Sequence, residues 1–316
     1  MSTMTALETK FRLVTRSDFD GLVCAVLLKK LDLIDEIKFV HPKDMQDGAI
    51  DITANDITTN LPYVDGCHVA FDHHLSEISR RGKDPKSNHI INPDAPSAAR
   101  VVYDYYGGHD VFPEAWDDMM AAVDKADAAQ FSKDEILNPE GWVLLNYLMD
   151  SRTGLGRFRN FRISNYQLMM ELIDCCGNKT IDEIIALPDV QERVVLYSEH
   201  AELFTDQVKR CATVFGNVVV LDLRDEDTIY AGNRFMIYAL FPKCNISIHQ
   251  IWGFQKQNVV FAIGKSILDR SSKTNVGDLC LQFGGGGHNA AGTCQVPEAQ
   301  VNETKAALIQ QITSDG

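Results

Sequence analysis

The stretch Gly66-Cys67-His68-Val69-Ala70-Phe71-Asp72-His73-His74 decides how the rest of the sequence is interpreted. Its first six residues are mostly apolar and predict a short strand, which ends on one carboxylate and two imidazoles. Ligands of open α/β sheets bind at the carboxyl ends of the strands. We therefore expect Asp72, His73 and His74 to lie where the chemistry takes place, unless they only form a polar turn after the strand.

The segment that precedes this stretch predicts a strand, an acidic turn and a helix. Residues 11–15 are typical of a strand, and residues 22–31 carry apolar side chains at helical spacing. In the turn between them, Asp18 and Asp20 stand two residues apart, so that in extended backbone both side chains point the same way. Two converging carboxylates repel each other unless a cation lies between them. Capping of the helix would explain one of them but not both.

Two further segments predict strands that end on polar residues. Residues 36–40 lead to His41, and the β-branched stretch at residues 49–57 has Asp56 near its end. Isolated caps or turns would not repeat Asp or His at the end of strand after strand. The alternation of strands and helices predicts an α/β fold, with a doubly wound, mainly parallel sheet in the N-terminal domain.

The order of these motifs resembles that of the DHH phosphoesterase superfamily. The resemblance depends on the D-x-D-G of residues 18–21, an Asp after a middle strand, and the Asp-His-His of residues 72–74. That superfamily includes RecJ-like exonucleases, nanoRNases, linear dinucleotide phosphodiesterases, family II pyrophosphatases and exopolyphosphatases. The resemblance implies a site for two metal ions, with Mn²⁺ as the expected cofactor and Mg²⁺ as the alternative. Carboxylate and imidazole ligands also suit Mn²⁺ on chemical grounds.

The resemblance implies a role for each of these side chains. The metal ligands that it implies are Asp18, Asp20, Asp56, His73 and Asp127, with Asp56 bridging the two ions. The catalytic group that it implies is Asp72, His73 and His74. Asp124 stands three residues before Asp127 and is the alternative last ligand.

Arg16 departs from the family pattern. Family members usually have a histidine at this position of the first motif, and arginine cannot ligate a metal because it stays protonated. Either the first metal loses a ligand or gains a replacement such as His41, or Arg16 binds a substrate phosphate directly. The sequence therefore leaves open whether the site holds one metal ion or two.

A run of glycines near the C-terminus, Gly284-Gly285-Gly286-Gly287-His288, predicts an anion-binding loop. Without side chains, the backbone N–H groups can close around an anion. The run resembles the G-G-G-H signature of the DHH-associated C-terminal domain, which contacts the substrate, and Arg270 matches an arginine that binds phosphate there. The substrate-binding residues expected in all are Arg16, His74, Arg270, Gly285, Gly286, Gly287 and His288.

The chain is long enough for two domains of ordinary size. We expect a metal-binding catalytic domain at residues 1–195, a helical linker at 196–212, and a smaller α/β substrate-binding domain at 213–316. Residues 152–162 carry four arginines, with Phe158 and Phe161 between them. This loop is either a phosphate and nucleobase contact or a solvated loop that pairs with acidic neighbours.

Composition narrows the class of partner. A net charge of −14 argues against general binding of long nucleic acid, which needs a broad basic surface. The eight cysteines form no metal-binding or disulfide pattern, and the chain shows no signal-peptide core and no apolar run long enough for a membrane span. We expect a cytoplasmic protein, with a homodimer as one possibility, that binds a small phosphorylated substrate and neither long duplexes nor membranes.

The expected activity is metal-dependent hydrolysis of phosphodiester bonds in short linear nucleotides or oligonucleotides. Aromatic residues between the arginines favour nucleotides, since bases stack on aromatic rings. One alternative is an exopolyphosphatase or phosphoanhydride hydrolase, because the sequence looks closest to the exopolyphosphatase-related members. The other is a catalytically impaired nucleotide-binding sensor, for which Arg16 is the only support.

Overall fold

The computed structural model describes residues 10–74, 77–78 and 86–316. The chain divides into two compact units, which interleave along the sequence. The first unit comprises Met1–Gln130, Gly141–Asp150 and Arg159–Gln191, and the second comprises Phe131–Glu140, Ser151–Phe158 and Glu192–Gly316. The domain limits expected from the sequence stay a prediction.

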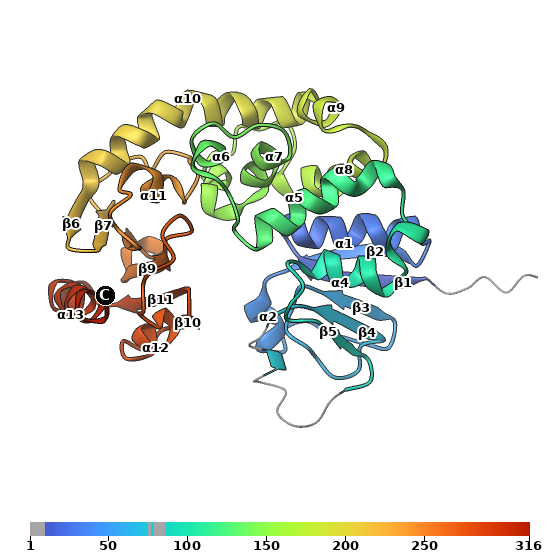
Figure 1. Cartoon of the computed structure of the whole chain (residues 1–316), viewed down its shortest axis with the longest axis horizontal. Coiled ribbons are helices and arrows are strands. Elements are labelled where there is room, and N and C mark those ends of the chain that lie inside the picture. The colour runs from blue at the N-terminus through green and yellow to red at the C-terminus, as the bar shows by residue number, and fades with distance from the viewer. Residues whose placement is uncertain (1–9, 75–76, 79–85) are drawn as a thin grey trace, which may run out of the picture. The chain divides into compact units, whose positions relative to one another are not determined.

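A five-stranded sheet, in which all strands run parallel, forms the centre of the first unit (Figure 1). Its strands are β1 Phe11–Arg16, β2 Ile34–Val40, β3 Asp56–Thr59, β4 Val69–Asp72 and β5 His89–Ile91. The order β2-β1-β3-β4-β5 is that of a doubly wound sheet, in which the winding direction reverses between β1 and β3. The predicted fold class is confirmed.

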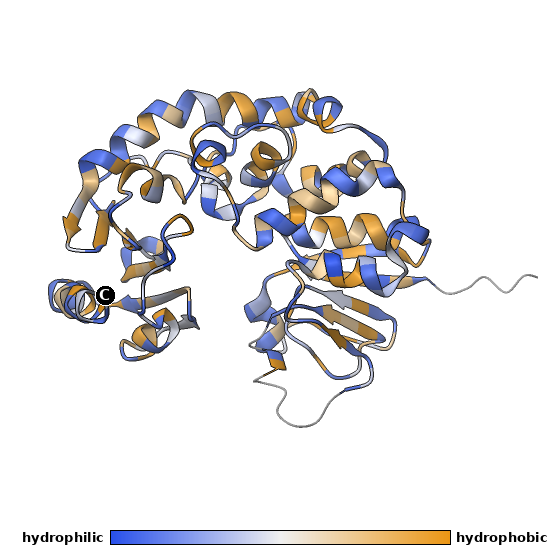
Figure 2. Ribbon diagram, in the orientation of Figure 1, coloured by the Kyte–Doolittle hydropathy of each residue, from blue (hydrophilic) through white to orange (hydrophobic). Residues whose placement is uncertain are grey.

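Helix α1 is the central helix of this unit. Ten consecutive residues from Phe19 to Leu28 are buried, and α1 packs against β1, α4, α5 and α8. A helix that is apolar around most of its circumference is buried on all sides, as the hydropathy colouring of α1 shows (Figure 2). The helices of the unit are α1 Phe19–Lys30, α2 Pro42–Gln46, α4 Ala98–Tyr105, α5 Asp117–Asp127, α7 Gly141–Met149, α8 Asn165–Asn178 and α9 Ile181–Ile185.

A six-stranded mixed sheet in the order β10-β11-β9-β8-β7-β6 forms the second unit. Only β7 and β8 pair in parallel among the described strands of this sheet. Its strands are β6 Ala212–Phe215, β7 Val218–Asp222, β8 Ile246–Trp252, β9 Val259–Lys265, β10 Gly286–His288 and β11 Ala291–Val296. Its helices are α6 Lys133–Leu137, α11 Met236–Leu240, α12 Val276–Leu281 and α13 Val301–Asp315. Helix α10 Pro188–Cys211 begins in the first unit and belongs to the second from Glu192 onward.

One core holds the second unit together. Phe261 of β9 packs with Leu279 of α12 and Leu308 of α13, and all three side chains are buried. This confirms a second α/β unit. None of the helices among the described residues is long and apolar enough to cross a membrane. Short 3₁₀ helices lie at Gly108–Asp110, Glu114–Trp116, Ser151–Thr153, Leu155–Arg157, Phe254–Lys256 and Glu298–Gln300.

The position of Asp56 corrects the sequence-based prediction. Asp56 is the first residue of β3 and not a residue at its end. Because β1 and β3 are parallel and Asp56 pairs in register with Arg12 near the start of β1, it lies at the amino edge of the sheet. The expected role of Asp56 as a bridging metal ligand is therefore wrong, since the other expected ligands follow the carboxyl ends of the strands.

Asp56 is held by an ion pair and by the turn that precedes it. Arg12 Nε donates to Asp56 Oδ1 over 2.6 Å and Arg12 Nη2 to Oδ2 over 3.0 Å. The backbone N–H of Thr53 donates to Oδ2 over 2.6 Å. These donors outweigh the opposing effect of burial and lower the pKa of Asp56. The β-branched residues on both sides of this turn hid the strand boundary in the sequence.

We expect Asp56→Ala to lower the free energy of unfolding by about 1–3 kcal/mol, because it leaves the Arg12 guanidinium and the Thr53 amide without their acceptor. Urea denaturation measures this, with Asp51→Ala as the control, since the Asp51 side chain is exposed in the same turn. The metal-dependent activity of the folded variant should stay within about threefold of the parent. If Asp56→Ala instead lost activity without losing stability, Asp56 would have to be a residue of the active site.

Candidate active site

The candidate site lies at the carboxyl edge of the parallel sheet. Arg16 ends β1, Asn60 follows β3 directly, and Asp72 ends β4 just before the two histidines. In doubly wound sheets, ligands bind outside the carboxyl ends of the strands where the winding direction reverses. Here that point lies between β1 and β3, so the side chains after these two strands belong to the site.

Asp20 is a buried carboxylate of the site. It lies in the first turn of α1 with 2% of its surface exposed. The backbone N–H groups of Ala98 and Ala99, in the first turn of α4, donate to its two oxygens over 3.0 and 2.7 Å. A helix cannot satisfy its first N–H groups itself, so Asp20 completes the start of α4. Burial and the charge of Asp127 raise the pKa of Asp20 to about 8.

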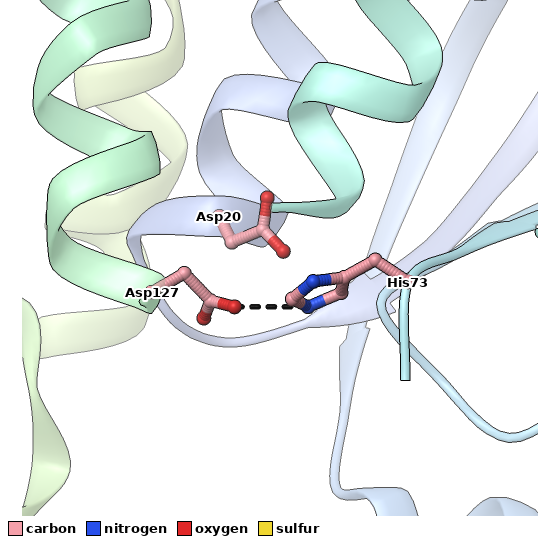
Figure 3. A group of neighbouring side chains, drawn as sticks. All are labelled: Asp20, His73 and Asp127. Atoms are coloured by element: carbon pink, nitrogen blue, oxygen red, sulfur yellow. Dashed lines mark ion pairs between the residues drawn. The ribbon is translucent and has the colours of Figure 1, made fainter. Parts of the chain in front are cut away.

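Asp20, His73 and Asp127 form a group that can hold a metal ion. One ligand atom from each of the three lies within 4.8 Å of the others, and the three side chains point toward one another (Figure 3). His73 Nδ1–H donates to the carbonyl oxygen of Ala95 over 3.1 Å, which leaves Nε2 for the site. Nε2 lies 2.9 Å from Asp127 Oδ2. Two oxygens and one nitrogen are a donor set that suits Mn²⁺ or Mg²⁺ better than a soft metal.

The protonation of this group also favours a cation. Burial would lower the pKa of His73, but the hydrogen bond and charge of Asp127 outweigh it and raise that pKa to about 9. Burial opposes ionisation of Asp127, but His73 lowers the pKa of this carboxyl. Both raised pKa values reflect the negative charge gathered in this group, which a divalent ion would neutralise.

Asp127 is the carboxylate that reaches His73, and Asp124 is not. Asp124 accepts from Ser97 Oγ over 2.7 Å and from Arg100 Nε over 2.9 Å, one turn earlier on α5. The structure therefore places Asp127, and not Asp124, next to His73. That Asp127 ligates a metal stays a prediction.

Asp18 lies in a different environment from Asp20. It caps α1, and its Oδ1 accepts from the backbone N–H of Gly21 over 3.0 Å and from Asn60 Nδ2 over 3.1 Å. Arg16 Nε lies 3.0 Å from its Oδ2. Both carboxylate oxygens of Asp18 are therefore engaged by donors from the same edge of the sheet.

His74 is held by the last residue of β4. Asp72 is 1% exposed, and its Oδ1 accepts from His74 Nδ1–H over 2.7 Å. Burial would lower the pKa of His74, but the hydrogen bond to Asp72 raises it. With Nδ1 engaged, the Nε2 side of the partly exposed imidazole is left to meet a substrate. The expected roles of Asp72 and His74 remain predictions.

The second half of the glycine run forms a strand and not an open loop. Gly286–His288 form β10, which pairs antiparallel with β11. A side chain at Gly285 would meet the carbonyl oxygen of Thr293 at 2.0 Å, so close packing requires glycine there. The N–H of Gly285 donates to the carbonyl of Cys280 over 2.9 Å. The expected anion contact of Gly285 is therefore wrong for its amide, because a helix carbonyl already takes that donor.

The remaining expected substrate residues of the second unit lie near this hairpin and before α12. His288 ends β10, where its Nδ1 accepts from the N–H of Ala290 over 3.3 Å. Arg270 lies in the segment between β9 and α12, where its Nε donates weakly to Ile267 O over 3.4 Å. Gly286 and Gly287 lie in β10 itself. Their roles in substrate binding stay predictions.

Two residues of the arginine-rich loop at residues 152–162 make contacts within the protein. Arg162 Nε donates to Asp189 Oδ1 over 2.9 Å within the first unit. The Phe158 ring meets His200 edge-on at 4.8 Å within the second. At these two residues the loop is packed against the protein, as its alternative interpretation expects.

Solved structures of other proteins share the fold of this chain. No family model and no curated protein sequence matches the chain. Among solved structures, the DHH domain of PF0399, a member of a family of ribosomal proteins, aligns over 97% of this chain and 87% of its own, with a TM-score of 0.55 and 12% identity. RecJ of Thermus thermophilus in complex with Mn²⁺ aligns over 97% of this chain and 52% of its own, with a TM-score of 0.55 and 14% identity. These two share the fold.

A third structure is similar in sequence as well. It is a pGpG-specific phosphodiesterase, PggH from Vibrio cholerae, with 63% identity and a TM-score of 0.86. The match covers 97% of this chain and 100% of that one. The chain belongs to the DHH phosphoesterase superfamily. It is a phosphoesterase, a hydrolase of phosphodiester bonds, as the motifs around Asp18 and Asp72 predict.

The sequence-based assignment of this DHH site missed Asn60. Asn60 directly follows β3, where the family pattern has an Asp after a middle strand, and it stands four residues after Asp56, which the sequence predicts for that position. The available signal was its place directly after the β-branched run Ile57-Thr58-Thr59. An asparagine there also suits a turn, which is why the pattern did not single it out.

We expect Asp127→Ala to weaken Mn²⁺ binding at least about 100-fold, since loss of a group that only orients a metal ligand already costs about 10–100-fold. Asp124→Ala is the matched control on the same helix, because Asp124 pairs with Arg100 and not with His73. Isothermal calorimetry on the metal-free protein measures both affinities. Equal losses in the two variants would remove Asp127 from the site.

Proposed function

We propose that the chain hydrolyses pGpG, a linear dinucleotide, to two molecules of GMP. The observation that carries this proposal is 63% identity, over 97% of this chain and 100% of the other, with a pGpG-specific phosphodiesterase. Water adds to the bridging phosphorus, the bond from that phosphorus to the 3′ oxygen breaks, and this oxygen leaves with a proton. One GMP carries the terminal phosphate of the substrate, and the other carries the phosphate that was attacked.

The residues of the carboxyl edge have separate parts in this reaction. Asp20, His73 and Asp127 hold a divalent ion, for which we propose Mn²⁺ with Mg²⁺ as the alternative. When bound there, such an ion would supply a lowered pKa to a water molecule and neutralisation of the charge that develops on the phosphoryl group. Asp72 holds His74 through Nδ1, so that the other ring nitrogen can hand a proton to the leaving 3′ oxygen.

One experiment distinguishes the proposed function from two others, a phosphoanhydride hydrolase and a nucleotide-binding sensor. The chain, charged with Mn²⁺, is given pGpG, pApA, a short RNA and polyphosphate side by side, and released GMP, AMP and phosphate are quantified. We expect GMP from pGpG with a kcat/KM at least about tenfold above that for AMP from pApA, because groups that pair with guanine are left unpaired by adenine. His73→Ala should be inactive, which excludes a contaminating enzyme.

The remaining outcomes are equally informative. Phosphate from polyphosphate without GMP from pGpG would replace the proposal by a phosphoanhydride hydrolase. Binding of nucleotide without any turnover would replace it by a sensor.

We also propose that His288 contributes to substrate binding. His288→Ala should then raise KM for pGpG about tenfold with kcat changed less than about threefold, since one hydrogen bond to a charged phosphate is worth about 1.5 kcal/mol. Steady-state kinetics measures both constants. A fall in kcat at constant KM would instead give His288 a role in the chemical step.

A further inference from the structure

Three side chains at the reversal point of the sheet form a network of their own. Arg16 Nε lies 3.0 Å from Asp18 Oδ2, and Asn60 Nδ2 donates to Asp18 Oδ1 over 3.1 Å. The N–H of Gly21 also donates to Oδ1, over 3.0 Å. Asp18 is therefore surrounded by donors, one of which carries a positive charge.

This network does not fit a second divalent ion. Among the described residues, the group able to hold a metal comprises Asp20, His73 and Asp127, and Asp18 is outside it. Arg16 cannot ligate a metal, and its guanidinium would repel a divalent ion that shared Asp18. Asn60 can offer an ion only a neutral oxygen. The pair of ions that the family implies therefore lacks ligands on this side.

Asn60 is suited to the network for two reasons. Its backbone φ is +54°, a conformation that asparagine tolerates better than most residues. Its side chain is 1% exposed and lies against a carboxylate, so the amide must point its N–H toward Asp18 and not its oxygen. An aspartate in its place would put a second negative charge about 3 Å from Asp18 and would need a cation between them.

Arg16 and Asn60 are two departures from the family pattern, and together they change the charge of this edge by as much as one divalent ion would. An arginine in place of a histidine adds one positive charge, and an asparagine in place of an aspartate removes one negative charge. The sum is two positive charges, which is the charge of Mn²⁺ or Mg²⁺. Either change alone would leave this edge of the sheet with half of that compensation.

Arg16 keeps access to a ligand while Asp18 holds it. Its side chain is 35% exposed, and its contact with Asp18 is made through Nε. The terminal nitrogens of a guanidinium form a planar fork that pairs with two oxygens of a phosphate. An anchored and partly exposed arginine at a ligand-binding edge is thus equipped to bind a phosphoryl group.

We propose that Arg16 takes the place of one ion of the two-metal site. The chain binds one divalent ion, at Asp20, His73 and Asp127. The Arg16 guanidinium, held by Asp18 and supported by Asn60, binds a phosphoryl oxygen of the substrate. The part of this proposal that concerns the substrate rests on the proposed function, whereas the metal count does not.

The number of ions is measured first. Metal-free parent protein is titrated with Mn²⁺ by isothermal calorimetry, and the bound metal is counted by elemental analysis after gel filtration. We expect one Mn²⁺ per chain and the electron paramagnetic resonance spectrum of an isolated ion. Two Mn²⁺ per chain with a spin-coupled spectrum would overturn the proposal.

The double variant Arg16→His with Asn60→Asp tests the cause. It returns an imidazole and a carboxylate to the edge, so we expect it to bind a second Mn²⁺ and to show spin coupling. A folded double variant that still binds one ion would refute the role of these two residues in excluding the second. Circular dichroism establishes folding, and Asn60→Asp alone serves if the double variant does not fold.

Arg16→Gln tests the phosphate contact. We expect its Mn²⁺ affinity to stay within about threefold of the parent and its kcat/KM for pGpG to fall about 100-fold, the usual effect of removing one donor to a developing charge. Unchanged kcat/KM would refute the contact. If pGpG is not turned over at all, binding of inorganic phosphate to the parent and the variant measures the contact instead. Failure of the proposed substrate is then separate from failure of the metal count.

Discussion

The buried carboxylate of Asp20 is the constraint on which the site depends. A carboxylate taken out of water is very costly unless hydrogen bonds or opposite charge replace its hydration. At Asp20 two backbone amides from the first turn of α4 supply part of this, and they are amides that the helix itself cannot satisfy. The turn after β1 and the start of α4 therefore hold each other in place, and the remaining charge of Asp20 has to be balanced by what approaches it.

The side chains next to Asp20 also favour the binding of a cation. Asp127 is the last residue of α5, at the negative end of the helix dipole, where a carboxylate is locally unfavourable. His73 directly follows β4 and points toward both carboxylates, and its Nδ1–H donates to the backbone carbonyl of Ala95. Burial and the helix end thus concentrate negative potential on one imidazole nitrogen. The fold creates this potential before any ion is bound, which is why the group suits a divalent metal.

The sequence predicts this site to the extent that side-chain identity marks the ends of strands. Asp-His-His and D-x-D are unusual enough to be recognised, and the parallel sheet predicted around them is the one that forms. Asp56 failed because β-branched residues lie on both sides of it, and only the register of β3 with β1 reveals that it pairs with Arg12. Strand β10 was missed because glycine has low strand propensity. Its pairing depends on the close approach of β11, which no local pattern encodes.

A guanidinium in place of an ion changes which step this edge can assist. Both neutralise charge on a phosphoryl oxygen, but only an ion ligates a water and lowers its pKa. If Arg16 takes the place of an ion, as proposed, water would be activated only on the side of Asp20, His73 and Asp127. The planar fork of a guanidinium, in contrast, accepts phosphate oxygens in a defined orientation, whereas an ion attracts them with less directionality. One ion and one arginine would therefore make a site that orients its substrate more strictly than two ions would.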